Sequence, residues 1–174
     1  ALAAWHAAWA VAAALLALGG RWFGGLDGPA FYAVVVMVIP GIAGLGLLAR
    51  DGDRERLTSL AVWSLASAVA AALSGGLSGA LAGFTFMPLA VGLAMGGQKR
   101  AQAGLIGVVI AVGVGAISAR FAGPWSPQPL AAALSTLMVV AATALGLRLS
   151  WRTAEARLIA AEAAVTRVEA LLSR

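Results

Sequence analysis

The chain consists mainly of long apolar stretches separated by short polar or glycine-rich segments. Six stretches approach the ~20 residues that an α-helix needs to cross a lipid bilayer. None of the six contains Asp, Glu, Lys or Arg. They cover residues 2–19, 30–49, 57–74, 79–97, 101–119 and 129–147. The pattern predicts an all-α integral membrane protein built as a bundle of six transmembrane helices.

The composition agrees with this pattern and narrows the chemistry. Hydrophobic residues make up 61% of the 174 residues and charged residues 11%, whereas soluble domains contain ~25% charged residues. The chain has no cysteine and one histidine, His6, so we predict no metal site. The basic residues are scattered along the chain, which argues against nucleic-acid binding.

The basic residues divide unequally between the two ends of the predicted bundle. Only Arg21 and Arg120 lie at one end. Cytoplasmic loops of membrane proteins carry an excess of Lys and Arg. We therefore predict cytoplasmic N- and C-termini and a multi-pass chain in the bacterial inner membrane. The basic residues on the predicted cytoplasmic side are Arg50, Arg54, Arg56, Lys99, Arg100, Arg148, Arg152, Arg157, Arg167 and Arg174.

The segment GGLSGALAGF has two interpretations. Its G-x-S-G sequence around Ser78 resembles the serine motif of rhomboid intramembrane proteases. Alternatively, Gly75, Gly79 and Gly83 recur every four residues, as on a helix-packing face. A serine nucleophile needs a base, but the sixth span has no histidine, lysine or carboxylate. His6 lies at the other end of the predicted bundle, where we expect a solvated or capped side chain. We reject the protease interpretation and predict the packing face.

A group of aromatic and sulfur-containing residues in the third and fourth spans is the best candidate for a ligand pocket. A proline kink beside aromatic side chains can open an apolar pocket with a polar handle. The same residue types also fill bundle cores or face lipid. The candidate residues are Trp63, Phe84, Thr85, Phe86, Met87 and Pro88.

Residues 151–174 contain no Gly or Pro, and most of them favour helix. Apolar residues occupy every a and d position of a heptad repeat, as in a coiled coil. Arg157 at g is spaced to pair with Glu162 at e of a parallel partner. The a positions are Trp151, Leu158, Val165 and Leu172, and the d positions are Ala154, Ala161 and Val168.

The heptads are not separated from the last predicted span by any helix breaker. We expect one helix that leaves the bundle and forms a parallel coiled coil in a homodimer. The predicted domains are a transmembrane sensor or anchor domain, 1–149, and a cytoplasmic signalling linker, 150–174, whose heptads continue beyond the chain. The alternative is a helix on the membrane surface, which its glutamates disfavour.

The stretch SGGLSGALAGFTFMPLAVGLAMGGQKRA resembles the middle of the six-span sensor region of DivJ-type sensor histidine kinases of alphaproteobacteria. The shared features are a Gly-Gly turn, a following span with Pro-Leu, a small residue and a basic inner loop. They correspond to Gly75, Gly76, Pro88, Leu89, Gly96, Lys99 and Arg100. The resemblance implies a homodimeric membrane kinase whose catalytic region follows this chain, uses ATP and Mg²⁺, and phosphorylates a response regulator.

We interpret the chain as the non-enzymatic, transducing part of such a kinase, because it contains no phosphoacceptor histidine motif. It would relay a membrane or small-ligand signal through the coiled coil to a catalytic domain outside this chain. We expect no cofactor here, and we expect membrane lipid, a second copy, the kinase region and the response regulator as partners. Two alternatives stay open: a passive membrane anchor, and a small carrier or substrate-binding membrane subunit for an uncharged or apolar ligand.

Overall fold

The computed structural model describes residues 2–23, 26, 28–50, 52–121 and 129–172, and in these residues the chain forms helices and turns. The elements are α1 (Leu2–Trp22), α2 (Gly28–Leu48), α3 (Asp53–Leu73), η1 (Gly76–Ser78), η2 (Ala82–Phe86), α4 (Met87–Met95), α5 (Gln98–Phe121) and α6 (Pro129–Leu172). The α-helices follow the predicted apolar stretches closely, except in the region of the fourth span.

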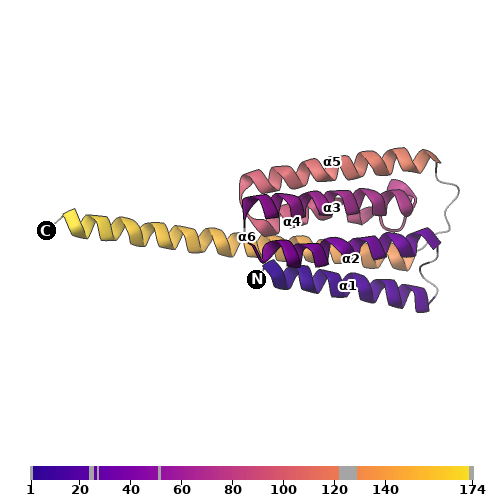
Figure 1. Cartoon of the computed structure of the whole chain (residues 1–174), viewed down its shortest axis with the longest axis horizontal. Coiled ribbons are helices and arrows are strands. Elements are labelled where there is room, and N and C mark those ends of the chain that lie inside the picture. Colours follow the sequence, from indigo (N-terminus) through magenta and orange to yellow (C-terminus); the bar gives the residue numbers. More distant parts are fainter. Residues whose placement is uncertain (1, 24–25, 27, 51, 122–128, 173–174) are drawn as a thin grey trace.

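The helices lie side by side and alternate in direction (Figure 1). In this bundle α1 packs on α2, α2 on α3, and α3 on α5, while α4 contacts both α5 and α6. Among the described residues, five helices are long and apolar enough to cross a membrane: α1, α2, α3, α5 and α6. The structure therefore has the architecture expected of a multi-pass membrane protein.

The fourth predicted span, 79–97, is wrong as a single membrane-length helix. The chain forms η1 and η2 there, followed by α4 with only nine residues. Gly75 and Gly76 after α3 have φ of 94° and 70°, which glycine adopts without steric cost. Pro88 lies in the first turn of α4, where its missing N–H is tolerated. Gly96, with φ of 69°, ends this short helix.

The three glycines predicted to share a helix-packing face do not share one. Gly75 is left-handed, Gly79 is extended, and Gly83 lies in η2 beside Thr136 of α6. A Cβ on Gly79 would overlap the carbonyl oxygen of Ser74. This prediction is wrong because the residues form a turn, so their spacing of four does not place them on one side of a helix.

Glycines in α4, α5 and α6 provide close helix contacts instead. A Cβ on Gly104 of α5 would lie 2.5 Å from the carbonyl oxygen of Pro88. A Cβ on Gly146 of α6 would lie 2.8 Å from the carbonyl oxygen of Ala90, and Gly92 of α4 faces the α5 backbone equally closely. Small residues of this kind let membrane helices approach each other. They hold α4 between α5 and α6.

The last helix, α6, is continuous over 44 residues, which confirms the prediction that one helix runs from the bundle into the heptad segment. Its first half belongs to the bundle, and its second half extends alone from the end at which α1 begins (Figure 1). Every residue from Trp151 to Glu169 is exposed. We call residues 150–172, which include this exposed part, the stalk.

Candidate functional site

Aromatic rings from three elements meet inside the bundle near the end from which the stalk emerges. Trp5 and Trp9 of α1 place their ring centroids 5.6 Å and 5.5 Å from that of Trp63 of α3. Phe84 of η2 lies 5.7 Å from Trp9, edge to face, a favourable arrangement for aromatic pairs. We call these four residues together with His6 the aromatic cluster.

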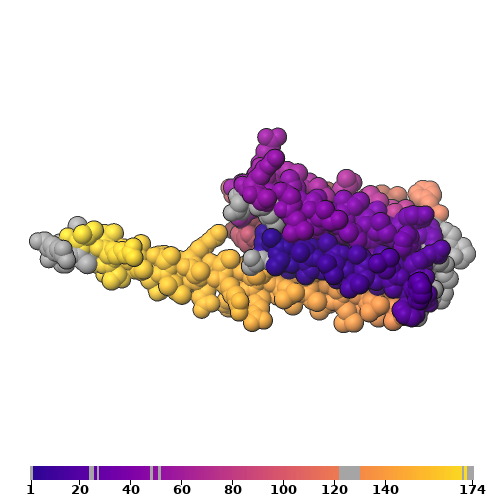
Figure 2. Space-filling model, turned by 60° about the horizontal axis from the view of Figure 1, so that its bottom comes forward, coloured from indigo at the N-terminus to yellow at the C-terminus, as the bar shows by residue number. Residues whose placement is uncertain are grey.

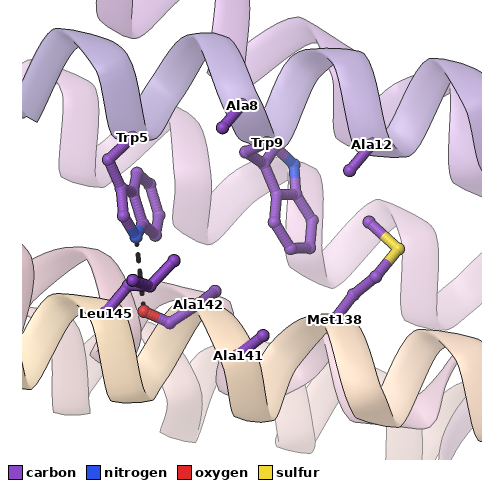
Figure 3. A pocket seen from close by; sticks show the side chains of 8 residues that line it. All are labelled: Trp5, Ala8, Trp9, Ala12, Met138, Ala141, Ala142 and Leu145. Atoms are coloured by element: carbon purple, nitrogen blue, oxygen red, sulfur yellow. Dashed lines mark hydrogen bonds between the residues drawn. The ribbon is translucent and has the colours of Figure 1, made fainter.

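The indole N–H groups of the aromatic cluster connect α1 to its neighbours. Trp9 Nε1 donates to the carbonyl oxygen of Met37 in α2 at 2.9 Å. Trp5 Nε1 donates to the carbonyl oxygen of Ala142 in α6 at 3.3 Å, as the dashed line in Figure 3 shows. Because buried polar groups need partners, these bonds fix the orientation of both rings. The cluster thus ties α1 to α2 and α6.

The prediction for His6 was a solvated or capped side chain, and the solvated alternative is wrong because His6 is fully buried. Its Nε2 accepts a hydrogen bond from Trp63 Nε1 at 3.4 Å, and its Nδ1 lies 3.0 Å from the carbonyl oxygen of Leu2 in the same helix. Both contacts fit the tautomer that carries its proton on Nδ1. Gly44 of α2 leaves room for the imidazole, because a Cβ there would overlap the ring.

The predicted pocket residues lie close together but mainly fill the core. Phe86 is the exception, because this residue is 51% exposed. Thr85, the polar member of the group, donates its hydroxyl locally to the carbonyl oxygen of Ala82 at 2.7 Å. The buried members are Trp63, Phe84, Thr85, Met87 and Pro88. Their packing accounts for the aromatic and methionine content without a ligand.

The predicted heptad positions of the stalk lie on an exposed face of α6. Trp151 is 78% exposed and Leu158 66% exposed. Val165 and Val168 are also exposed, as are Ala154 and Ala161. The side chain of Leu172 lies outside the described residues. The face therefore has no partner among the described residues of this chain.

The same heptad register continues upstream into the bundle half of α6. Leu137 and Ala144 occupy a positions there, Val140 and Leu147 occupy d positions, and all four are exposed. The repeat predicted from the sequence starts at Trp151 and omits these residues, because apolar residues are expected on every face of a membrane span. These residues could be recognised by their angle around α6, because they share the face of the stalk's a and d positions and point away from the buried residues of α6. We call the face from Leu137 to Val168 the heptad face.

Arg100 organises the end of the bundle from which the stalk leaves. Its guanidinium donates to Asp53 of α3 at 2.5 Å and to the carbonyl oxygens of Met95 and Gly96 at 3.1 Å each. It thereby ties the start of α3 to the turn between α4 and α5. The starts of α3 and α5 and the stalk all lie at this end (Figure 1), so the basic residues of the described segments gather here, except Arg21 and Arg120 at the opposite end, as the charge pattern predicts.

Ser78 is exposed in the turn that follows α3, whereas His6 is buried near the start of α1. Because α1 and α3 run in the same direction (Figure 1), the two residues lie toward opposite ends of the bundle. Within the described segments, no group of three or more His, Cys, Asp or Glu side chains is placed to hold a metal ion.

Comparison of the chain with protein-family models, with curated proteins and with solved structures found no match. Its function is therefore argued from the bundle and the stalk alone.

Proposed function

We propose that the chain is the transmembrane signalling module of a sensor kinase of the two-component type, with its N- and C-termini in the cytoplasm. Two copies pair through the heptad face, and α6 carries a change in the bundle to a catalytic domain outside this chain. The observation that supports this proposal is the unbroken helix α6. A passive membrane anchor does not need a rigid helix that continues from its core.

The heptad face gives the proposed dimer its geometry. Its residues alternate at spacings of three and four from Leu137 to Val168, the repeat that brings two parallel helices together. At 1.5 Å per residue, the stalk from Ser150 to Leu172 is roughly 33 Å long. A dimer along the whole face would couple the bundle to the far end of the stalk without a flexible joint.

The contact between α4 and α6 is where the bundle can set the position of the stalk. Gly146 of α6 lies against Ala90 and Ala94 of α4, only a few residues before the stalk begins. A small shift or rotation of α6 at this contact would change the phase of the paired helices beyond it. Transitions of this kind, which repack an interface between two arrangements, are common in signalling proteins.

Cysteine crosslinking tests the dimer. The natural chain has no cysteine, so single variants report on one position each. We expect Leu158→Cys and Val165→Cys to form symmetric disulfide dimers in membranes under mild oxidation. The matched controls Ala156→Cys and Ala163→Cys are equally on the exposed stalk but at f positions, and we expect them to crosslink much less. Equal crosslinking at both sets, or at neither, would contradict the proposal.

A second experiment separates signal transduction from anchoring. Gly146→Ala introduces a Cβ against α4, whereas Gly113→Ala on α5 meets no atom within 4 Å. We expect Gly146→Ala, and not Gly113→Ala, to change the ratio of disulfide formation at positions 158 and 161 of the stalk. An unchanged ratio in both variants, with dimers still formed, would instead support a passive anchor.

A further inference from the structure

An apolar groove runs along the seam between α1 and α6. On one face of the molecule these two helices lie next to each other, with the stalk continuing beyond them (Figure 2). The groove has a volume of about 170 Å³. In Figure 3 the rings of Trp5 and Trp9 reach from α1 toward α6, where Met138, Ala141 and Leu145 complete the lining. We call it the seam groove.

The seam groove continues into a basic mouth at the stalk end. A second depression of about 390 Å³ shares Trp5 and Leu145 with the seam groove and is also lined by Arg148 and Arg152. The two arginines are four residues apart and so lie on the same side of α6. Within the described segments neither of them forms an ion pair. The seam groove therefore opens beside two exposed arginines that form no ion pair within the described segments.

The combined length of the seam groove and its basic mouth matches one acyl chain of one membrane leaflet. Ten residues of α6 separate Met138, at the far end of the seam groove, from Arg148 at the mouth. Ten helical residues span about 15 Å, which is half of the ~30 Å hydrocarbon core. The arginines then lie where the headgroups of that leaflet begin.

We propose that the seam groove and its basic mouth bind an anionic phospholipid from the leaflet on the stalk side. An acyl chain lies along Trp5, Trp9 and Ala141, and the headgroup phosphate accepts hydrogen bonds from Arg148 and Arg152. Arginine binds phosphate in a fixed, often bidentate geometry, and basic pockets between membrane helices suit anionic headgroups.

Charge and position favour a lipid over a second copy of the chain as the occupant. A second copy placed symmetrically on the groove would bring its own arginines near Arg148 and Arg152. The seam groove is also centred away from the heptad face, since Arg152 follows Trp151 by one residue and therefore by about 100° around the helix. Arg148 and Ala141, at e positions, flank the heptad face on the side of the groove. The lipid site therefore lies beside the proposed dimer contact, and lipid binding and crosslinking test the two proposals separately.

Native mass spectrometry of the full chain, released from detergent after addition of dioleoylphosphatidylglycerol or dioleoylphosphatidylcholine, tests the headgroup. We expect phosphatidylglycerol to bind at least about fivefold more tightly, and the double variant Arg148→Gln/Arg152→Gln to weaken its binding about thirtyfold, since each surface cation contributes on the order of 1 kcal/mol to anionic lipid binding. Arg167→Gln is the control, because it removes one charge from the same helix farther along the stalk. Equal binding of both lipids, or equal losses in control and double variant, would overturn the proposal.

A groove-filling variant tests the acyl chain. Ala141 is exposed in the seam groove, and Ala61 is exposed on α3 away from it. We expect Ala141→Phe to reduce phosphatidylglycerol binding severalfold and Ala61→Phe to leave it unchanged. If Ala141→Cys instead forms disulfide dimers as efficiently as Leu158→Cys, a second copy covers the groove and the lipid proposal is wrong. The lipid-binding results do not determine whether Leu158→Cys crosslinks. The lipid proposal and the dimer proposal can therefore fail independently.

Discussion

The helix α6 has two sides in the bundle that are packed in different ways. Toward α4 and the turn before η2 it presents Gly146, which brings the backbones of α6 and α4 together, and Ser135, whose hydroxyl donates to the carbonyl oxygen of Ala80 in that turn at 2.9 Å. Toward α1 it meets the large rings of Trp5 and Trp9, and apolar grooves remain beside them. We call these the closed side and the open side of α6.

The difference follows from the residue sizes at each contact. Glycine and alanine on both helices of the closed side allow main-chain contact, which leaves little room for adjustment. On the open side, tryptophans oppose alanines, and the rings hold the helices apart without filling the space between them. The helix that continues into the stalk is therefore fixed on one side and adjustable on the other. Substitutions on the two sides should therefore lower the free energy of unfolding by different amounts.

Gly104→Leu should have the largest effect, because it destroys the support of the closed side. A side chain at Gly104 of α5 meets the carbonyl oxygen of Pro88 and the Cα of Leu89, both backbone atoms that cannot rotate away. We expect a loss of about 3 kcal/mol or more in the free energy of unfolding. Denaturation with sodium dodecyl sulfate in mixed micelles measures it. Gly113→Leu on the same helix meets nothing within 4 Å, and an equal loss there would refute the explanation.

Gly44→Ala should have the next largest effect, acting on the support of α1 at the open side. The new Cβ would overlap the imidazole of His6, displacing it from Trp63. We expect a loss of about 2 kcal/mol in the same assay, whereas Gly46→Ala, which meets nothing within 4 Å, should be neutral or slightly stabilising. In a double-mutant cycle, His6→Ala should remove most of the extra cost. Additive losses would show that the two residues do not interact.

Matched substitutions on α6 itself compare its two sides directly. Gly146→Ala places a methyl group 2.8 Å from the carbonyl oxygen of Ala90, and we expect a net loss of about 1 kcal/mol after the better helix propensity of alanine is included. Ala141→Leu adds a larger group but projects into the seam groove, so its change should stay within about 0.5 kcal/mol, as for most surface substitutions. If Ala141→Leu lowers the free energy of unfolding more than Gly146→Ala does, the open side has no room for the larger side chain and the distinction between the two sides is wrong.

Features that depend on a single segment of the chain could be predicted from the sequence most reliably. The five long helices and the continuity of α6 follow from apolar length and from the absence of helix breakers, both of which are properties of a single segment. The fourth span was mispredicted because an apolar run looks the same whether it faces lipid or is enclosed by protein. Irregular backbone is tolerated at membrane depth when neighbouring helices cover it, and Leu81 and Phe84 are fully buried.

The candidate site was harder to predict because it depends on pairs of helices. Aromatic content correctly indicated that Trp63 and Phe84 lie in one region, but residue types do not show whether they leave a cavity. The burial of His6 depends on Gly44, which belongs to a different helix. The seam groove likewise arises from tryptophans in α1 opposite alanines in α6, residues at opposite ends of the sequence. The dimer and the cytoplasmic position of the termini remain predictions.

Trp5→Phe should have a modest effect on stability and the most specific effect on structure. Trp5 Nε1 donates the hydrogen bond that crosses the open side to Ala142, and its loss should cost about 1 kcal/mol. Without this bond, α1 and α6 should separate at the stalk end. Distances between spin labels at Ala4→Cys and Arg148→Cys, both lining the basic mouth, should broaden and lengthen.

Trp9→Phe provides the control, because Trp9 bonds to Met37 of α2 and not to α6. It should cost a similar amount of stability and leave the distance between the labels unchanged. If both variants widen the mouth equally, the aromatic cluster acts as one packed unit, and the single hydrogen bond does not hold the open side. If only Trp5→Phe widens it, one indole N–H limits how far α6 can move away from α1, and therefore how far the stalk can tilt while the closed side stays in place.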